Sequence, residues 1–143
     1  MNTLPPYTFS QWQEPNFRAV NQFYRSQKHK GSASGDEHVF IIKDVDDIIG
    51  AVRLVPYEGY FWLRSLYIKQ EIQAQGLGSA LLAFVHSHIS LPIYCFPYLH
   101  LDHFYSKAGY DLVKEAELPQ NLAQLYGRYN RKGQGVLVMA KGL

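Results

Sequence analysis

The chain has 143 residues, 47% of them hydrophobic, and a net charge of +2 at pH 7. This length predicts one domain with a core large enough to fold without disulfides or structural metals. The small net charge argues against nucleic acid or a membrane as the main partner, and the single cysteine, Cys95, excludes a disulfide within the chain. We recognise no secretory leader and no apolar run of membrane-spanning length, so we expect a cytoplasmic protein.

The first half of the chain predicts a strand, a helix and three further strands. A short strand over 7–12 precedes apolar residues at helical spacing, which predict a helix over 15–27. β-Branched and aromatic residues then predict strands over 38–43, 48–55 and 61–68. Only short polar segments separate these three strands, which favours an antiparallel meander.

The second half alternates helices and strands. Asp102 is predicted to cap a short helix that Gly109 closes. The predicted helices are 75–90, 102–109 and 119–126, and the predicted strands are 93–96, 110–117 and 135–141. The order predicts an α/β fold, a single domain over residues 1–143, with a mixed sheet that is mostly antiparallel at first and has one parallel crossover in the middle.

A glycine-containing turn joins the strand over 61–68 to the helix over 75–90. Gly76 and Gly78 stand one residue apart at the start of that helix. Glycines there leave backbone N–H groups uncovered, and the helix dipole adds partial positive charge. Such a helix start binds phosphate without a basic side chain. In the alternative structural interpretation, the glycines only permit a tight turn and close packing of helix on sheet.

Two other phosphate-binding motifs fit the turn poorly. The dinucleotide fingerprint needs a third small residue three positions after its second glycine, where this chain has Leu81. A P-loop needs Gly-Lys followed by Ser or Thr, which the sequence lacks near the turn. The antiparallel meander before the turn also argues against an unrelated nucleotide-binding α/β domain.

Two segments together resemble the GNAT N-acetyltransferase family. Gln73-Ala74-Gln75-Gly76-Leu77-Gly78 matches the family's acetyl-CoA motif, Arg/Gln-x-x-Gly-x-Gly/Ala, and it follows the strand segment Leu63–Ile68. Downstream, Phe104-Tyr105-Ser106-Lys107-Ala108-Gly109-Tyr110 is similar to the family's phenylalanine-tyrosine-x-x-x-glycine-aromatic segment. The resemblance spans about residues 48–138. It implies the GNAT acyl-CoA N-acyltransferase fold and transfer of acetyl from acetyl-CoA to a primary amine by direct attack on the thioester.

The resemblance also implies roles for particular residues. Tyr105 would be the general acid that protonates the departing thiolate. Backbone groups of Leu66, Tyr67 and Ile68 would meet the pantetheine arm and the acetyl carbonyl. The pyrophosphate would be held by the turn, made of Gln73, Ala74, Gln75, Gly76, Leu77, Gly78 and Ser79.

The acceptor and the general base are less well marked. Arg64, on the predicted central strand, is a candidate for binding an anionic group of the acceptor, although a structural ion pair is the alternative. Some relatives carry a glutamate base where this chain has Trp62, and an asparagine where it has Tyr98. Glu58, His100 or a water relay are the remaining candidates for the base. The acceptor stays open among polyamines, amino acids, aminoglycosides and protein amines.

No metal is expected, because His100, Asp102 and His103 are more simply explained as a loop and a helix cap. The partners expected are acetyl-CoA and an amine acceptor, and neither a homodimer nor a preference for another acyl-CoA is decided by the sequence. A non-catalytic module that binds acyl-CoA through the same fold is the alternative function. Tyr105, if it lies where the resemblance implies, favours the enzyme.

Overall fold

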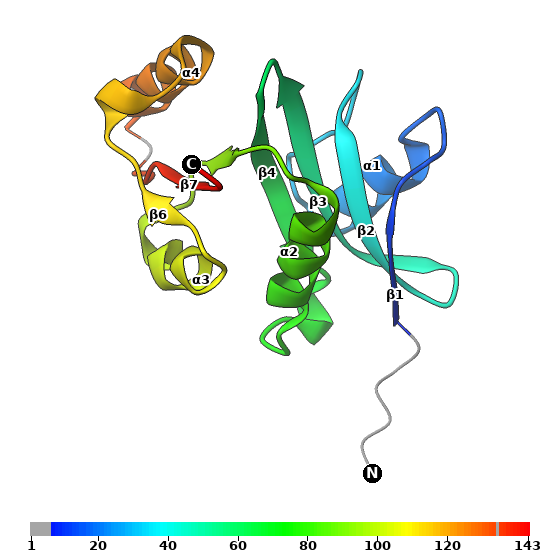
Figure 1. The fold of residues 1–143 in the computed structure, drawn as a ribbon. Coiled ribbons are helices and arrows are strands. Elements are labelled where there is room, and N and C mark those ends of the chain that lie inside the picture. The colour runs from blue at the N-terminus through cyan, green and yellow to red at the C-terminus, as the bar shows by residue number, and fades with distance from the viewer. Residues whose placement is uncertain (1–6, 134) are drawn as a thin grey trace. The chain divides into compact units, whose positions relative to one another are not determined.

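The computed structural model describes residues 7–133 and 135–143 (Figure 1). Within these residues the fold is mixed α/β, as the sequence predicts. The strands are β1 (Tyr7–Gln11), β2 (His38–Asp44), β3 (Asp47–Tyr57), β4 (Tyr60–Ile68), β5 (Ile93–Cys95), β6 (Asp111–Leu112) and β7 (Met139–Lys141). The α-helices are α1 (Arg18–Ser26), α2 (Leu77–His88), α3 (Asp102–Lys107) and α4 (Gln120–Arg131).

The chain forms two compact units, and β4 contributes residues to both. The first unit contains Leu63–Ile89 and the described part of Met1–Pro56. The second contains Tyr57–Trp62 and Ser90–Leu143. The chain therefore passes from the second unit into the first within β4, after Trp62.

The first unit contains an antiparallel sheet of β1, β2 and β3. β1 pairs antiparallel with β2, and β2 pairs antiparallel with β3. The pairing of β2 with β3 confirms the first hairpin of the meander predicted over 38–43, 48–55 and 61–68. Only two residues, Val45 and Asp46, separate β2 from β3, and Val45 has a φ of +56°. A positive φ in so short a connection matches the right-handed twist of the two strands that it joins.

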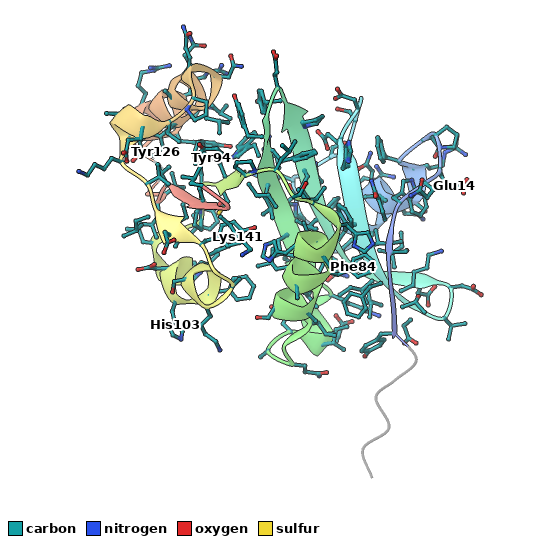
Figure 2. All side chains as sticks on the ribbon, viewed as in Figure 1. Glu14, Phe84, Tyr94, His103, Tyr126 and Lys141 are labelled. Carbon is teal, nitrogen blue, oxygen red and sulfur yellow. The ribbon has the colours of Figure 1, made fainter. Side chains whose placement is uncertain are left out.

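Helices α1 and α2 cover opposite faces of the sheet in the first unit, as Figure 1 shows. Val39 and Ile41 of β2 pack in one core cluster with residues of α1. Phe40, between them, has its ring centroid 6.0 Å from that of Phe84. Figure 2 labels Phe84 on α2. Successive side chains of a strand point to opposite faces, so an apolar run in β2 can serve both helices.

In the second unit, β7 pairs antiparallel with both β5 and β6. The backbone N–H of Phe61, early in β4, donates to the carbonyl of Pro92 at 2.9 Å. An aromatic cluster packs beside these strands: the ring centroid of Phe96 lies 5.6 Å from Trp62 and 5.5 Å from Tyr126 of α4. Aromatic rings at such separations contribute both buried area and favourable edge geometry.

The predicted start of the first helix is wrong, because α1 begins at Arg18 rather than Pro15. The indole N–H of Trp12 donates to the carbonyl of Asn16 at 2.8 Å, and Asn16 Oδ1 accepts from the Arg18 N–H at 3.0 Å. Side-chain bonds of this kind hold the backbone in a turn that competes with helix.

The predicted cap at Asp102 is also wrong. Asp102 is the first residue of α3, and no side-chain hydrogen bond caps that helix. The strand predicted over 110–117 ends at Leu112, and the chain then makes a short 3-10 turn, η3 (Glu115–Glu117). The polar run at 114–117 has no apolar alternation to keep it in a sheet.

Candidate functional site

The glycine turn lies in the first unit, between β4 and α2. The chain leaves β4, makes a 3-10 turn, η1 (Gln70–Ile72), and enters α2 after Gly76. Ala74 has a φ of +65° and Gly76 a φ of +83°, so two left-handed residues stand within this short segment. Gly76 suits its position because a side chain would be strained at that φ. The turn at residues 73–76 is exposed to solvent.

The N-terminus of α2 is suited to an anion. No side chain caps it, and its first turn carries no acidic residue. The first four N–H groups of a helix have no partner within the helix, and the dipole places partial positive charge on them. Ser79 is exposed in this first turn. The predicted phosphate-binding segment, Gln73 to Ser79, therefore presents backbone N–H donors at the start of α2, a helix of twelve residues.

The side chain of Gln73 has a structural role of its own. Its Nε2 donates to the carbonyl oxygen of Ile68 at 2.8 Å. This bond joins the first residue of the turn to the end of β4, where the Lys69 N–H also donates to the Ile49 carbonyl at 2.8 Å. The Gln73 side chain thus fixes the turn against the strand, and only its backbone remains as a candidate for contact with phosphate.

The predicted pantetheine segment of β4 follows a residue with unusual backbone geometry. Ser65 has a φ of +58°, which L-amino acids other than glycine rarely adopt. Leu66 and Tyr67 come next and are half-buried, and Ile68 is buried. A left-handed residue in a strand redirects the backbone groups that follow it, as in a β-bulge.

Sequence reasoning missed a buried polar network around Ser65. Arg53 of β3 is 5% exposed, and its Nε and Nη2 donate to the two carboxylate oxygens of Glu37, both at 2.8 Å. Its Nη1 donates to Ser65 Oγ at 3.0 Å. The hydroxyl of Tyr24 on α1 donates to the Ser65 carbonyl at 2.7 Å. The one available signal was an arginine inside the apolar strand predicted over 48–55.

Arg64 is half-buried next to this network. Its positive charge, together with that of Arg53, acts on His29: burial is the first cause that lowers the pKa of His29, and the two arginines lower that pKa further. His29 Nδ1 accepts from the Gly31 N–H at 2.8 Å, which places any ring proton of the neutral imidazole on Nε2. The His29 ring lies between those of Tyr24 and Tyr67, at 5.0 and 5.3 Å. Burial and the two arginines thus favour the neutral form of His29.

Tyr105 belongs to the second unit, whereas the glycine turn, residues 66–68 and Arg64 belong to the first. It lies on α3, is 6% exposed, and makes edge contacts with the rings of Phe104 and Tyr110 at 5.1 and 5.5 Å. Burial, and next the neighbouring Cys95 thiol, raise the pKa of Tyr105 above its ordinary value. Its hydroxyl therefore stays protonated at neutral pH and can act as a hydrogen-bond or proton donor.

The two candidates for the base are surface residues. Glu58 is exposed in the turn between β3 and β4. His100 is exposed, and its ring lies parallel to that of Tyr98 with the centroids 6.1 Å apart. In the described part of the chain, no three His, Cys, Asp or Glu side chains gather as a metal would require. None of its helices has the length and apolar character to cross a membrane.

Comparison with known proteins adds a family match. The family model for the acetyltransferase (GNAT) domain matches residues 35–112, more than half of the chain. No curated protein matches the sequence.

Solved structures share the fold at low identity. N-acetylglutamate synthase from Neisseria gonorrhoeae, solved with coenzyme A and N-acetyl-glutamate, superposes with a TM-score of 0.72 at 16% identity, over 94% of this chain and 34% of that protein. The chain thus spans about a third of that synthase. ElaA from Escherichia coli gives 0.69 at 13% identity, over 94% and 99% of the two chains. Naa50 from Arabidopsis thaliana, solved with a bisubstrate analogue, gives 0.66 at 15%, over 96% and 99%.

Proposed function

Because the chain belongs to the GNAT acetyltransferase family, we propose that it is an acetyl-CoA-dependent N-acetyltransferase acting on a primary amine. Members of this family are N-acetyltransferases that use acetyl-CoA. The observation that carries the proposal is the exposed turn with two left-handed residues that opens onto the uncapped start of α2. Such a terminus suits the pyrophosphate of a coenzyme A ester.

In this proposal, backbone groups of the segment 73–79 hold the pyrophosphate. The backbone of Leu66, Tyr67 and Ile68 meets the pantetheine arm and the acetyl carbonyl. Ser65, with its φ of +58°, directs the N–H groups that follow it in β4. No metal takes part, because backbone N–H donors can stabilise the charge that develops on the carbonyl oxygen.

The reaction is a direct transfer. The amine nitrogen attacks the thioester carbonyl carbon, the carbon–sulfur bond breaks, and the products are an N-acetylated amine and coenzyme A. Tyr105 gives its hydroxyl proton to the departing sulfur, and the amine nitrogen loses a proton to solvent or to a base. The tyrosinate then takes a proton back from solvent or from that base, which restores the enzyme. Alignment of the two reactants supplies much of the acceleration expected for such a step.

The Tyr105 hydroxyl is protonated at neutral pH, so it has a proton to give. Burial, and next the Cys95 thiol, raise its pKa, which makes it a weaker acid than an exposed tyrosine. Its proposed role as the acid therefore rests on the match of residues 104–110 to the family's second segment. Arg64 is proposed to bind an anionic group of the acceptor, since it is a half-buried cation on β4 directly before Ser65 and the proposed pantetheine segment.

The test is the release of free coenzyme A thiol from acetyl-CoA with polyamines, amino acids, aminoglycosides and peptides as separate acceptor panels. We expect release with at least one panel and a mass increase of one acetyl group on the acceptor. Tight binding of acetyl-CoA without release in any panel favours the non-catalytic module. Binding of NAD or ATP in place of acetyl-CoA contradicts the proposal altogether.

A further inference from the structure

Ser65 needs an external constraint to keep its backbone conformation. It is a non-glycine residue at φ +58° inside a strand, where the extended conformation is the favoured one. Such residues persist where the surrounding structure over-determines them. Two side chains donate hydrogen bonds to Ser65, one to its backbone carbonyl and one to its hydroxyl.

The bond to the backbone comes from α1. The Tyr24 hydroxyl donates to the Ser65 carbonyl at 2.7 Å, and Tyr24 is completely buried. Burial is the largest cause that raises the pKa of Tyr24. The Glu37 carboxylate also raises this pKa, whereas Arg53 and Arg64 lower it, and the net shift is upward. The hydroxyl therefore remains a donor throughout the neutral range. A buried carbonyl that lost this donor would be costly, so the bond strongly favours the observed direction of the Ser65 peptide.

The bond to the side chain comes from an arginine that is itself fixed. Both carboxylate oxygens of Glu37 bind the Arg53 guanidinium, and the side chains of the pair are 9% and 6% exposed. Two parallel bonds set the plane of the guanidinium, so its remaining Nη1 is aimed at Ser65 Oγ. A Cβ on Gly31 would lie 2.5 Å from that Oγ, so the backbone of residue 31 closes the other side.

We propose that Tyr24, Arg53 and Glu37 are positioning residues for acyl transfer. They hold Ser65 in its left-handed conformation and so direct the backbone N–H groups of residues 66–68 at the thioester carbonyl. The inference rests on the proposed function. It adds that the alignment of these N–H groups with the negatively charged carbonyl oxygen of the transition state depends on a buried network. That network reaches from α1 through β3 to β4.

Two substitutions at Ser65 separate this role from a general structural one. Ser65→Ala and Ser65→Gly both lose the Oγ bond to Arg53, but only glycine adopts a positive φ without strain. We expect Ser65→Ala to lose about tenfold or more in kcat, approaching the loss seen when one oxyanion donor is removed. Ser65→Gly should keep kcat within about threefold of the wild type. In an ordinary strand position the order would be the reverse, because glycine weakens strands.

A binding measurement gives a second readout that does not need turnover. The Kd values of coenzyme A and acetyl-CoA are measured by calorimetry for the wild type and both variants. The acetyl carbonyl is the group that distinguishes the two ligands, so Ser65→Ala should lose preference for acetyl-CoA while keeping its Kd for coenzyme A. Tyr24→Phe should behave like Ser65→Ala, and adding Ser65→Gly to Tyr24→Phe should restore much of the loss.

The possible results bear on two separate proposals, the acetyltransferase function and the positioning role of the network. A wild type that binds neither ligand contradicts the proposed function and this inference with it. A wild type that binds and turns over, with the alanine and glycine variants equal in kcat and in ligand preference, overturns the positioning role alone. Variants that differ only in melting temperature would also overturn it, because they would show a structural role. Glu37→Gln, which keeps the shape of the side chain, should lower kcat in parallel.

Discussion

At the scale of single residues, Tyr105 separates catalysis from ligand binding. If its hydroxyl protonates the leaving sulfur, Tyr105→Phe should lower kcat by about 10²–10⁴ and leave the Kd of acetyl-CoA nearly unchanged. The ring is retained, so the edge contacts with Phe104 and Tyr110 should survive. The measurement is steady-state kinetics with one good acceptor, together with calorimetry.

The pH profile provides a check on the same residue. Burial raises the pKa of Tyr105, so its acid form persists to higher pH than that of an ordinary tyrosine, which titrates near about 10. Any alkaline loss of kcat in the wild type that is due to this group must therefore begin above about pH 10. A Tyr105→Phe enzyme with wild-type kcat would remove the tyrosine from the mechanism.

Substitution of Arg64 tests how the amine acceptor is bound. Arg64→Ala should raise the KM of an anionic acceptor by about tenfold or more, because a charge-assisted bond to substrate would be lost. The Kd of acetyl-CoA should change little. Arg18→Ala, which removes an exposed arginine at the start of α1, is the matched control and should change neither constant. Equal weakening of both ligands by Arg64→Ala would indicate a structural role.

Single residues were predictable where their backbone conformation follows from the local sequence. The left-handed conformation of Gly76 at the start of α2 confirms the turn predicted from the spacing of the two glycines. The network of Tyr24, Glu37, Arg53 and Ser65 was not predictable, because its bonds join residues 12 to 41 positions apart in the sequence. No periodicity in a single sequence reports such contacts.

At the scale of elements, the N-terminus of α2 can be tested with a charge. Gly78→Glu places a carboxylate in the first turn of the helix, where an anion stabilises the helix by about 0.3–1 kcal/mol. The free protein should therefore keep or raise its melting temperature. The same carboxylate should repel the pyrophosphate and abolish the stabilisation by acetyl-CoA, which is about 2.7 kcal/mol at a ligand concentration of 100 Kd.

Gly127→Glu is the matched control for this prediction. Gly127 lies inside α4, away from a helix start, and a Cβ there would approach only the end of the flexible Arg131 side chain, at 3.7 Å. This variant should retain the full thermal shift with acetyl-CoA. A Gly78→Glu protein that also retains the full shift would show that the pyrophosphate is bound elsewhere.

Elements with strong patterns were predicted well, and elements set by tertiary contacts were not. The antiparallel pairing of β2 with β3 followed from their apolar runs and the short turn between them. α1 begins three residues late because Asn16 and Trp12 hold the preceding residues in a turn. α4 runs to Arg131 rather than ending near Tyr126. Tyr129, three residues after Tyr126, continues the apolar spacing and packs edge-on against Phe96 at 5.8 Å.

At the scale of the whole molecule, buried thiol and tyrosine hydroxyl groups predict a loss of stability at alkaline pH. Burial raises the pKa of the Cys95 thiol, and also those of Tyr24, Tyr105 and Tyr110. Above the unfolded pKa of a thiol, about 8.5, the unfolded chain binds fewer protons than the folded one. The free energy of unfolding should therefore fall as pH rises, by up to about 1.4 kcal/mol per pH unit for Cys95 alone.

Urea unfolding between pH 7 and pH 10 measures this slope. Cys95→Ala should lower stability at neutral pH, because it removes buried volume, but it should flatten the slope above about pH 8.5. The tyrosines should add a second, steeper decline above about pH 10. An unchanged slope in Cys95→Ala would show that the thiol ionises equally in both states.

The prediction of a single domain also belongs to this scale. Two compact units are present, but each contains segments separated in the chain, and β4 supplies residues to both. We propose that the two units unfold together. Each unit contains part of β4, so unfolding of one unit would disrupt a strand that the other unit contains.

The division of β4 also limits how the protein can be taken apart. A fragment ending at Ile89 would carry Tyr57–Trp62 without the residues that pack on it in the second unit. The rings of Tyr60 and Trp62 would lose Tyr94 and Phe96, and the Phe61 N–H would lose its acceptor on Pro92. An aromatic strand end with unpaired backbone is a template for aggregation. A two-fragment version of this protein would therefore need both fragments to be produced together. The second fragment would then pair with residues 57–62 of the first before those residues aggregate.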